Sequence, residues 1–322
     1  MWMYKLRMYL LLVAMFAIVY AIVSMAAYGF LGVRDFNFYL ILSVVMLVVQ
    51  YMLGPKLVEW SMRVRYVTPQ EFPQLFAMVT ELSRRANLPM PRIGVSQVPF
   101  PNAFAFGRWK SDGRICVTDG ILRLLNPQEL KAVVGHEMSH LKNRDVLVIT
   151  LLSVIPMILY RIAWSTFFYG GSRRREGGGY TALVGMAAFV FYFITNLLVL
   201  YASRIREYFA DKGSIELGNS AHNLASALYK LVYGSARLPK DSLREVEGLK
   251  AFFVNDPSRA VNELRELRQL DLDKSGAIDS EELSQLNRKV VRLSFGDKLM
   301  ELLSTHPNML KRIKRLSEYK KS

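Results

Sequence analysis

The apolar positions of this chain gather in four long segments, and stretches of mixed polarity separate and follow them. The apolar segments are residues 8–31, 36–53, 146–169 and 180–201. A transmembrane helix needs about 20 apolar residues, so each segment is long enough to cross a bilayer. The pattern divides the chain into four parts. They are a transmembrane hairpin (1–55), half of a soluble domain (56–144), a second apolar hairpin (145–202) and the other half of that domain (203–322).

The first apolar segment has one feature of a signal peptide, because Ser24-Met25-Ala26 resembles a cleavage site. Its apolar core is longer than the roughly 7–15 residues of a signal peptide, and a second apolar segment follows at once, so we expect an uncleaved helix. Basic residues flank the outer ends of the first hairpin, and the positive-inside rule then puts both ends in the cytoplasm. This predicts a multi-pass protein of the plasma membrane with a cytoplasmic soluble domain.

The second apolar hairpin is less regular than the first. Pro156 and Arg161 interrupt its first half, and a glycine-rich loop with Arg173, Arg174 and Arg175 joins its halves. A complete hairpin would put these arginines outside, against the positive-inside rule. Two spans are favoured, and a hairpin that lies partly in the interface or within protein stays open.

Residues 56–144 have the pattern of a soluble α+β unit. Helical spacing of apolar residues predicts a helix over 69–87, and short β-prone runs predict extended pieces at 93–98, 102–106 and 114–118. Asn126-Pro127-Gln128-Glu129 is a helix start, with an N-cap, a proline in the first position and a glutamate in the third. With the helical pattern of 203–322, the expected fold class is α-rich α+β with a small antiparallel sheet.

Composition supports a membrane protein and limits the metal chemistry. The chain is 52% hydrophobic, and its net charge of +15 fits basic residues that flank membrane spans. We expect no nucleic-acid partner, because no recognition motif accompanies the charge. One cysteine, Cys116, excludes an intramolecular disulfide. With four histidines in all, a zinc site must draw its ligands from His, Asp and Glu.

The segment His136-Glu137-Met138-Ser139-His140 carries the clearest chemistry. Histidines four residues apart project from one face of a helix, so both imidazoles can reach one zinc ion. Glu137 lies between them and is placed to take a proton from a water molecule on the zinc. The motif predicts a metallohydrolase and in the first place a protease.

A catalytic zinc usually has three protein ligands and one open position. Glu207 and Asp211 are four residues apart on a predicted helix that continues the fourth apolar segment. Glu207 could bind the zinc, and Asp211 could accept a hydrogen bond from a ligand imidazole. The alternative from spacing alone is a pair of solvated carboxylates beside Arg204 and Arg206.

The order of these motifs resembles the HtpX-type membrane zinc proteases, which are relatives of the CAAX prenyl proteases and have a gluzincin fold. The matching segments are HEMSH with Leu-Lys-Asn-Arg-Asp after it, an apolar hairpin, Arg-Glu-Tyr-Phe-Ala-Asp, Asn102-Ala103-Phe104-Ala105, and Ser304-Thr305-His306-Pro307 followed by Arg312-Ile313. The resemblance covers most of the chain. It implies that Glu207 is the third ligand of one zinc ion, and it implies a role in membrane-protein quality control and the stress response.

The resemblance also implies roles for two other segments. Asn102, Ala103, Phe104 and Ala105 correspond to an edge strand that can pair with an extended substrate. His306 could approach the reacting carbonyl and stabilise its negative charge, or it could be a capping or supporting histidine.

Residues 271–282 fit the loop of an EF-hand calcium site, which is not typical of the HtpX-type pattern. The predicted ligands, at positions 1, 3, 5, 7, 9 and 12, are Asp271, Asp273, Ser275, the Ala277 carbonyl, Asp279 and Glu282. Gly276 occupies the sharp turn. The alternative is a polar helix–turn–helix that no longer binds calcium.

Together these features predict a membrane-embedded zinc endopeptidase with polypeptide substrates, chiefly exposed or misfolded segments of membrane proteins near the cytoplasmic face. The zinc motif lies about five residues from one apolar segment and Glu207 about six from another, so the zinc is expected within roughly 10 Å of the membrane boundary. The alternatives are a non-catalytic membrane adaptor with a calcium-sensing helix pair and a zinc hydrolase that acts on other bonds.

Overall fold

The computed structural model describes residues 36–98, 100–169, 178–237, 260–273, 275–288 and 295–319. The first predicted apolar segment, 8–31, and the arginines at 173–175 lie outside these residues. The chain divides into two compact units. One unit comprises Met1–Leu53 and Leu147–Ile205, and the other comprises Gly54–Val146 and Arg206–Ser322. The predicted assignment of four segments to membrane and soluble halves stays a prediction.

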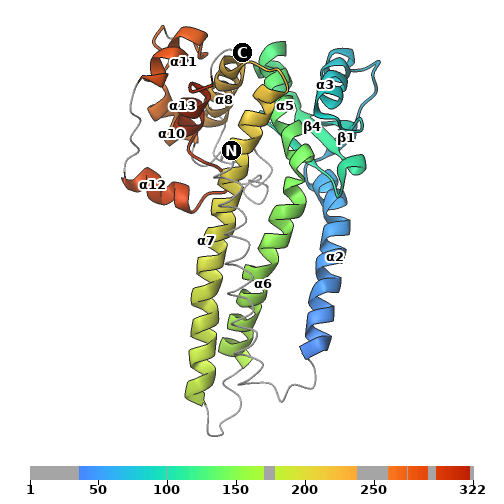
Figure 1. Cartoon of the computed structure of the whole chain (residues 1–322), viewed down its shortest axis with the longest axis vertical. Helices are drawn as coiled ribbons and strands as arrows, with labels where there is room; N and C mark the ends of the chain where they lie inside the picture. Colours follow the sequence, from blue (N-terminus) through green and yellow to red (C-terminus); the bar gives the residue numbers. More distant parts are fainter. Residues whose placement is uncertain are drawn as a thin grey trace. The chain divides into compact units, whose positions relative to one another are not determined.

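Three long helices have most of their residues in the first unit: α2 (Phe36–Ser61), α6 (Asp145–Tyr169) and α7 (Gly178–Glu216). Figure 1 shows α6 and α7 side by side. A small apolar cluster joins them, formed by Leu152, Ile155, Leu159, Val199 and Ala202. Each of the three predicted apolar segments in the described part of the chain is therefore helical.

Among the described helices, α7 is the one that is long and apolar enough to cross a membrane, from Leu183 onward. Within the structure, 22% of its apolar window is buried. Large side chains on it are exposed, including Leu183, Met186, Phe189 and Phe193. Membrane spans at α2 and α6 stay predictions.

Helix α2 extends beyond the predicted apolar segment 36–53, because it continues through Pro55 to Ser61. A proline inside a helix removes one backbone hydrogen bond and costs about 3 kcal/mol. Packing beyond the proline supports the continuation, since Val58 and Met62 are buried against Phe104.

The second unit contains a four-stranded sheet. Its strands are β1 (Val64–Tyr66), β2 (Arg92–Ser96), β3 (Ala103–Phe106) and β4 (Arg114–Thr118), in the order β1-β2-β4-β3. The β1–β2 and β3–β4 pairs are antiparallel and β2–β4 is parallel, so the predicted purely antiparallel sheet is wrong. The chain crosses to the far edge to form β3 and then returns between β2 and β3, which makes β4 run in the direction of β2. The sheet is mixed.

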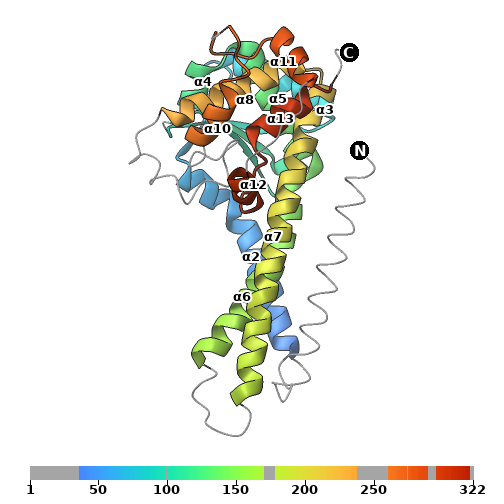
Figure 2. The ribbon, with the colours of Figure 1, turned by 90° about the vertical axis from the view of Figure 1, so that its left-hand side faces the viewer.

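Helices surround this sheet and share one apolar core with it. They are α3 (Pro73–Ala86), α4 (Asp119–Leu124), α5 (Pro127–Asn143), α8 (Ala221–Ala236), α10 (Ala260–Leu267), α11 (Ser280–Asn287) and α13 (Met309–Leu316). The unit also contains α12 (Phe295–Leu302) and a short 3-10 turn at Lys110–Asp112. Figure 2 shows α10, α11 and α13 close to α8, and α8 also contacts α5. The described part of the chain is thus an α-rich α+β protein, as predicted.

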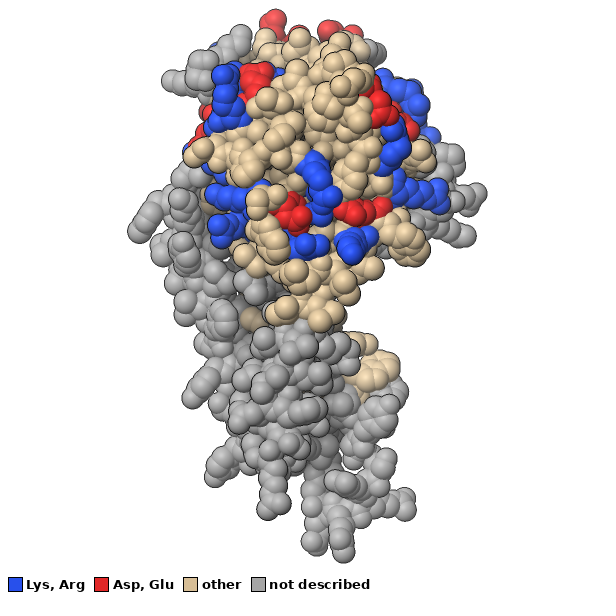
Figure 3. All heavy atoms as spheres, turned by 90° about the vertical axis from the view of Figure 1, so that its right-hand side faces the viewer, with Lys and Arg blue, Asp and Glu red and all other residues tan. Residues whose placement is uncertain are grey.

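Charged side chains of both signs share the surface of the second unit. On the face drawn in Figure 3, basic side chains lie next to acidic ones rather than in a patch of one sign. The ion pair of Arg85 with Glu81 at 2.6 Å, between side chains that are 41% and 31% exposed, is an example of such neighbouring charges on this unit.

Candidate metal centre

Helix α5 begins at the predicted signal. The Asn126 side chain accepts the Glu129 N–H, and the Glu129 carboxylate accepts the Asn126 N–H in return. Glu129 is buried, and it also accepts hydrogen bonds from Ser226 and Lys230 of α8. Hydrogen bonds within its first turn and to the neighbouring helix α8 therefore fix the start of the motif helix.

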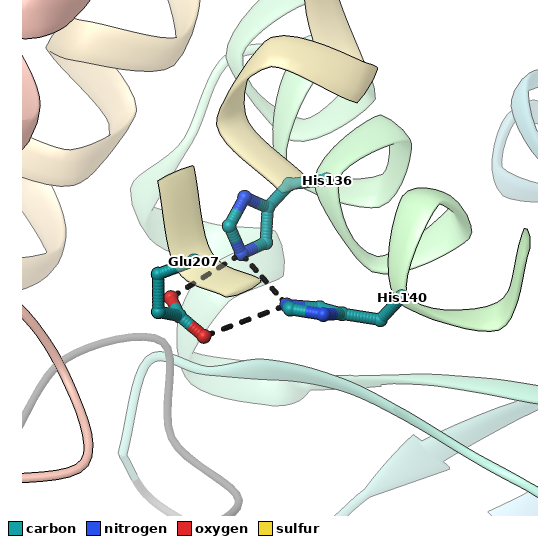
Figure 4. A group of neighbouring side chains, drawn as sticks. All are labelled: His136, His140 and Glu207. Carbon is teal, nitrogen blue, oxygen red and sulfur yellow. Dashed lines mark hydrogen bonds and ion pairs between the residues drawn. The ribbon is translucent and has the colours of Figure 1, made fainter. Parts of the chain in front are cut away.

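The two motif histidines project from successive turns of α5 toward Glu207 of α7 (Figure 4). Their Nε2 atoms are 3.1 Å apart. Glu207 Oε2 lies 3.6 Å from His136 Nε2, and Glu207 Oε1 lies 3.5 Å from His140 Nε2. His136 and Glu207 are buried. The structure thus brings together the three residues that were predicted as zinc ligands.

Two glycines allow α5 and the end of α7 to approach this closely. A Cβ added at Gly213 would lie 2.1 Å from Ser139 Oγ, and one at Gly135 would lie 2.2 Å from Asn219 Nδ2. Ser214 of α7 fills the space beside them and donates to the Ala132 carbonyl at 2.6 Å. Larger residues at either glycine would separate the histidines from Glu207.

The donor set fits a tetrahedral zinc ion. Zinc binds imidazole nitrogen and carboxylate oxygen at about 2.0–2.2 Å, and tetrahedral angles then put neighbouring ligand atoms about 3.3–3.5 Å apart. The two Nε2 atoms are 3.1 Å apart, and each lies 3.5 or 3.6 Å from a different oxygen of Glu207. One ligand atom from each of the three residues lies within 4.8 Å of the others, which is close enough for a shared ion. Glu207 Oε2 is buried, and Nη1 of Arg312 lies 3.1 Å from it. Three protein donors would leave a fourth position for water or substrate.

Each histidine presents its other ring nitrogen to a carboxylate. His136 Nδ1 lies 2.9 Å from Asp211 Oδ1, and His140 Nδ1 lies 2.5 Å from Asp145 Oδ2. A carboxylate at Nδ1 favours the tautomer whose Nε2 carries the lone pair that a metal needs. The position of Asp211 agrees with its predicted supporting role. Asp145 was missed, although it follows His140 by only five residues at the start of α6.

Arg312 of α13 is the most important residue that the sequence analysis did not place in the site. It is fully buried, and its guanidinium donates to Asp211 at 2.6 and 2.9 Å. Its Nη1 also lies 3.1 Å from Glu207 Oε2. Burial opposes its positive charge, but the carboxylates of Asp211 and Glu207 outweigh that effect and raise the pKa of Arg312. This arginine balances the charge of two buried carboxylates.

The electrostatic environment separates the titrations of the two imidazoles. Burial opposes protonation of His136, but the adjacent Asp211 and Glu207 carboxylates outweigh it and raise its pKa to about 9. Burial and the charge of His136 lower the pKa of His140. Burial raises the pKa of Glu137, mainly by disfavouring its carboxylate form. A glutamate with a raised pKa is suited to accept and return a proton.

The predicted substrate strand lies beside Glu137. Ala103, Phe104 and Ala105 belong to β3, which is an edge of the described sheet and packs near α5. The backbone of Ala105 favours the charged form of the Glu137 carboxylate and so acts against the rise in its pKa. Asn102 precedes the strand, is fully buried, and is tied to Thr118 through its backbone. This position agrees with the predicted edge strand, and its role in binding substrate stays a prediction.

His306 also lies near the predicted ligands. It is buried, and its Nδ1 is 3.4 Å from Glu207 Oε2. Neither of its ring nitrogens has a hydrogen-bond partner with correct geometry among the described residues. Its predicted catalytic role is untested by this geometry, which is also compatible with a supporting contact to Glu207.

A second group of carboxylates lies away from these residues in the sequence, within the predicted calcium loop. Asp271, Asp273 and Glu282 each have a carboxylate oxygen within 4.8 Å of the others. Asp279 is the N-cap of α11 and forms a capping box with Glu282. Ser275 Oγ lies 3.5 Å from the Ala277 carbonyl oxygen. Calcium binding here stays a prediction.

Comparison with known proteins supports this description. The sequence model of peptidase family M48 matches residues 69–320. A protein named protease HtpX homolog from Methanothermobacter thermautotrophicus is 52% identical over 231 residues, which cover 72% of this chain and 86% of that protein. Another from Moorella thermoacetica is 34% identical over 314 residues, which cover 95% of this chain and 91% of that protein.

Among solved structures, the crystal structure of Ste24p from S. mikatae resembles this fold with a TM-score of 0.52. The match covers 99% of this chain and 66% of that one at 14% identity. At that identity the likeness concerns the fold alone. The family match, by contrast, spans the metal group from His136 to Arg312, and full-length relatives share a third to a half of the sequence. The chain therefore belongs to peptidase family M48 and is a metalloprotease.

Proposed function

We propose that this chain is a zinc endopeptidase anchored in a membrane, with one zinc ion per chain held by His136, His140 and Glu207. The observation that carries the proposal is the convergence of one ligand atom from each of these residues to within 4.8 Å of the others. Zinc, when bound there, lowers the pKa of a water molecule and polarises the scissile carbonyl.

Glu137 acts as the general base. Its carboxylate takes a proton from the attacking water and later passes it to the amine that leaves. The burial that raises its pKa brings its proton affinity closer to that required for both transfers near neutral pH. The backbone of Ala105 favours the charged form of this carboxylate and partly offsets the effect of burial on its pKa.

Strand β3 binds the substrate backbone as an added strand. It pairs with β4 on one side and lies beside α5, so an extended peptide along its other edge would pass the histidines. His306 stabilises the negative charge that develops on the carbonyl oxygen, since its imidazole is close to Glu207 and its Nε2 has no hydrogen-bond partner in the described residues.

The substrates are exposed or unfolded segments of membrane proteins near the cytoplasmic face. The support is the continuity of α7, in which the apolar stretch from Leu183 leads directly into Glu207. A substrate segment that emerges from the bilayer would be near the zinc without unfolding a whole soluble domain. The basic residues that flank the first apolar hairpin support the cytoplasmic orientation.

The test is cleavage of a membrane-protein substrate in proteoliposomes by the wild type and by Glu137→Gln, with zinc measured in both. We expect cleavage to be abolished in the variant while its zinc content stays near one per chain. Unchanged cleavage by Glu137→Gln would refute the general-base role. Cleavage of casein but not of the membrane substrate would refute the substrate class and leave the zinc peptidase.

The same experiment addresses the two alternatives. A chelator that removes zinc stops cleavage by a peptidase, whereas an adaptor has no cleavage to stop. A hydrolase for other bonds would retain zinc and leave both protein substrates intact.

A further inference from the structure

The loop between α10 and α11 concentrates negative charge in a chain that is otherwise strongly basic. Residues 271–282 contain five carboxylates and one lysine, whereas the whole chain has a net charge of +15. Three of the carboxylates, on Asp271, Asp273 and Glu282, converge to within 4.8 Å. Like charges at such distances repel one another unless a cation lies between them.

One buried oxygen in this group has no partner. Asp271 is only 8% exposed, and its Oδ1 has no hydrogen-bond partner among the described residues. Its other oxygen, Oδ2, accepts the Gly276 N–H at 3.0 Å and the Tyr229 hydroxyl at 3.1 Å. The carboxylate is thus held by one oxygen while the other is free to bind a cation. A buried carboxylate oxygen without a partner is costly, and a bound cation would remove that cost.

The backbone has the turn that such a site requires. Gly276 has a positive φ of 80°, and open space surrounds the position of its missing Cβ. Glu282 is also buried, and its oxygens accept the backbone N–H groups of Leu272 and Asp279. These contacts bring the last predicted ligand back over the first part of the loop.

We propose that residues 271–282 bind one calcium ion and that the bound ion stabilises the helices that carry the zinc group. The donors are all oxygens, from carboxylates, the Ser275 hydroxyl and the Ala277 carbonyl, which is the set that calcium prefers. No imidazole or thiol in the loop would favour zinc.

Two contacts join the loop to the zinc-bearing helices. Tyr229, which donates to Asp271, lies on α8 between Ser226 and Lys230, and both of those residues hold Glu129 at the start of α5. On the other side, Lys314 of α13 donates to the carbonyls of Leu286 and Asn287 at the end of α11. The same α13 carries Arg312, which pairs with Asp211 and Glu207.

The test is calorimetric titration of the full-length, zinc-loaded protein in detergent with calcium chloride, in the presence of millimolar magnesium. We expect one calcium per chain with a dissociation constant below about 1 mM, the weak end of the range for such loops. Glu282→Gln removes the bidentate carboxylate but keeps an acceptor for the capping box, so the helix start is preserved. It should weaken calcium binding at least tenfold.

Glu281→Gln is the matched control, because Glu281 is adjacent and exposed, and this substitution makes the same change in charge at a position that is not a ligand. It should leave the affinity within about twofold of the wild type. Calcium should raise the melting temperature of the wild type and of Glu281→Gln, but not of Glu282→Gln. If Glu282→Gln does not fold, Asp273→Asn replaces it, since that side chain is exposed.

Absence of calcium binding by the wild type at 5 mM (about fivefold above the weakest expected constant) would overturn the proposal. Equal weakening in Glu281→Gln and Glu282→Gln would overturn it too, because net charge rather than a site would then explain the binding. Calcium binding without any change in melting temperature would overturn the stabilising role. None of these outcomes depends on proteolysis, so the peptidase proposal can fail separately.

Discussion

The zinc group and the proposed calcium loop bring side chains that can bind a metal together in opposite ways. The zinc group combines two imidazoles from α5 with a carboxylate from α7, and charged side chains from α6, α7 and α13 surround it. The calcium loop takes all its carboxylates from twelve consecutive residues, and one of the three that converge, Asp273, is exposed. The first site depends on how helices pack, whereas the second depends on how one turn is built. Loss of packing should therefore damage the first site far more than the second.

The two regions should differ most when one ligand carboxylate is removed from each of them. Glu207→Gln should reduce bound zinc from one per chain to nearly none and abolish proteolysis, because it removes a charged ligand. The loss should exceed the roughly 10–100-fold that removal of an outer hydrogen-bond partner costs. Glu282→Gln should leave zinc in place. Metal analysis of both variants after dialysis checks this, and loss of zinc from Glu282→Gln would show that the loop is needed for zinc binding itself and not only for the stability of the helices.

Replacement of Arg312 should produce the next largest effect, a loss of stability, because this residue is buried with two carboxylates. Arg312→Met leaves Asp211 and Glu207 without their common cation, and removal of one partner from such a buried pair costs about 3–5 kcal/mol. The loss of stability should be largest in zinc-free protein, because no metal charge then replaces the guanidinium. Thermal unfolding in detergent, with and without zinc, measures it.

Arg312→Lys is the control for charge. It keeps the positive charge but loses the fork that contacts both carboxylates, so it should recover part of the stability. Equal stability of the Met variant and the wild type would show that the cluster does not need this cation.

Asp145→Asn should have a smaller effect, confined to the zinc group. Asp145 contacts His140 Nδ1 and forms an ion pair with Arg206. Loss of the carboxylate weakens the orientation and basicity of the imidazole, and we expect zinc affinity to fall about 10–100-fold. Competition with a chromogenic chelator gives this affinity. Calcium affinity should stay at the wild-type value, and a parallel loss of both would contradict the comparison.

Local signals in the sequence predicted local structure well. The capping box of Asn126 and Glu129, strand β4 at Arg114–Thr118 and the helix over Pro73–Ala86 all involve neighbours within a few positions along the chain. Strand β1 was missed because three residues are too few to form an alternating pattern. The parallel pairing of β2 and β4 depends on where β3 lies, which no spacing in the sequence reveals.

The same division applies to the candidate site. The two histidines are one helical turn apart, so the motif itself indicated their convergence. Arg312 contacts Asp211 across 101 positions of sequence, and only the fold brings them together. Resemblance to a family supplied Glu207, because spacing alone favoured two solvated carboxylates. Asp145 could have been found, since an acid soon after a motif histidine is a natural partner for its second nitrogen.

The smallest predicted effect is a change in how fast Cys116, the single cysteine of the chain, is alkylated. Its reactivity reports on opening of the second unit, and it belongs to neither metal group. Its thiol is buried in β4, where a Cβ on Gly94 would lie 2.8 Å from Sγ. Burial raises the pKa of Cys116, so its neutral form is favoured in the folded protein. Its contribution to stability is therefore present below the pKa of an unfolded thiol, about 8.5, and is lost as the pH rises above that value.

Alkylation of Cys116 should thus require opening of the sheet. At pH 8, iodoacetamide labelling followed by mass spectrometry should be slow in the wild type and fast in denaturant. Because labelling follows the population of open molecules, each variant should accelerate it according to the stability that its metal group contributes. We expect Glu207→Gln to accelerate labelling more than Glu282→Gln does, and Glu281→Gln to match the wild type. Equal acceleration by the two ligand variants would mean that the exposed turn stabilises this unit as strongly as the buried cluster, which would reverse the contrast between the two regions.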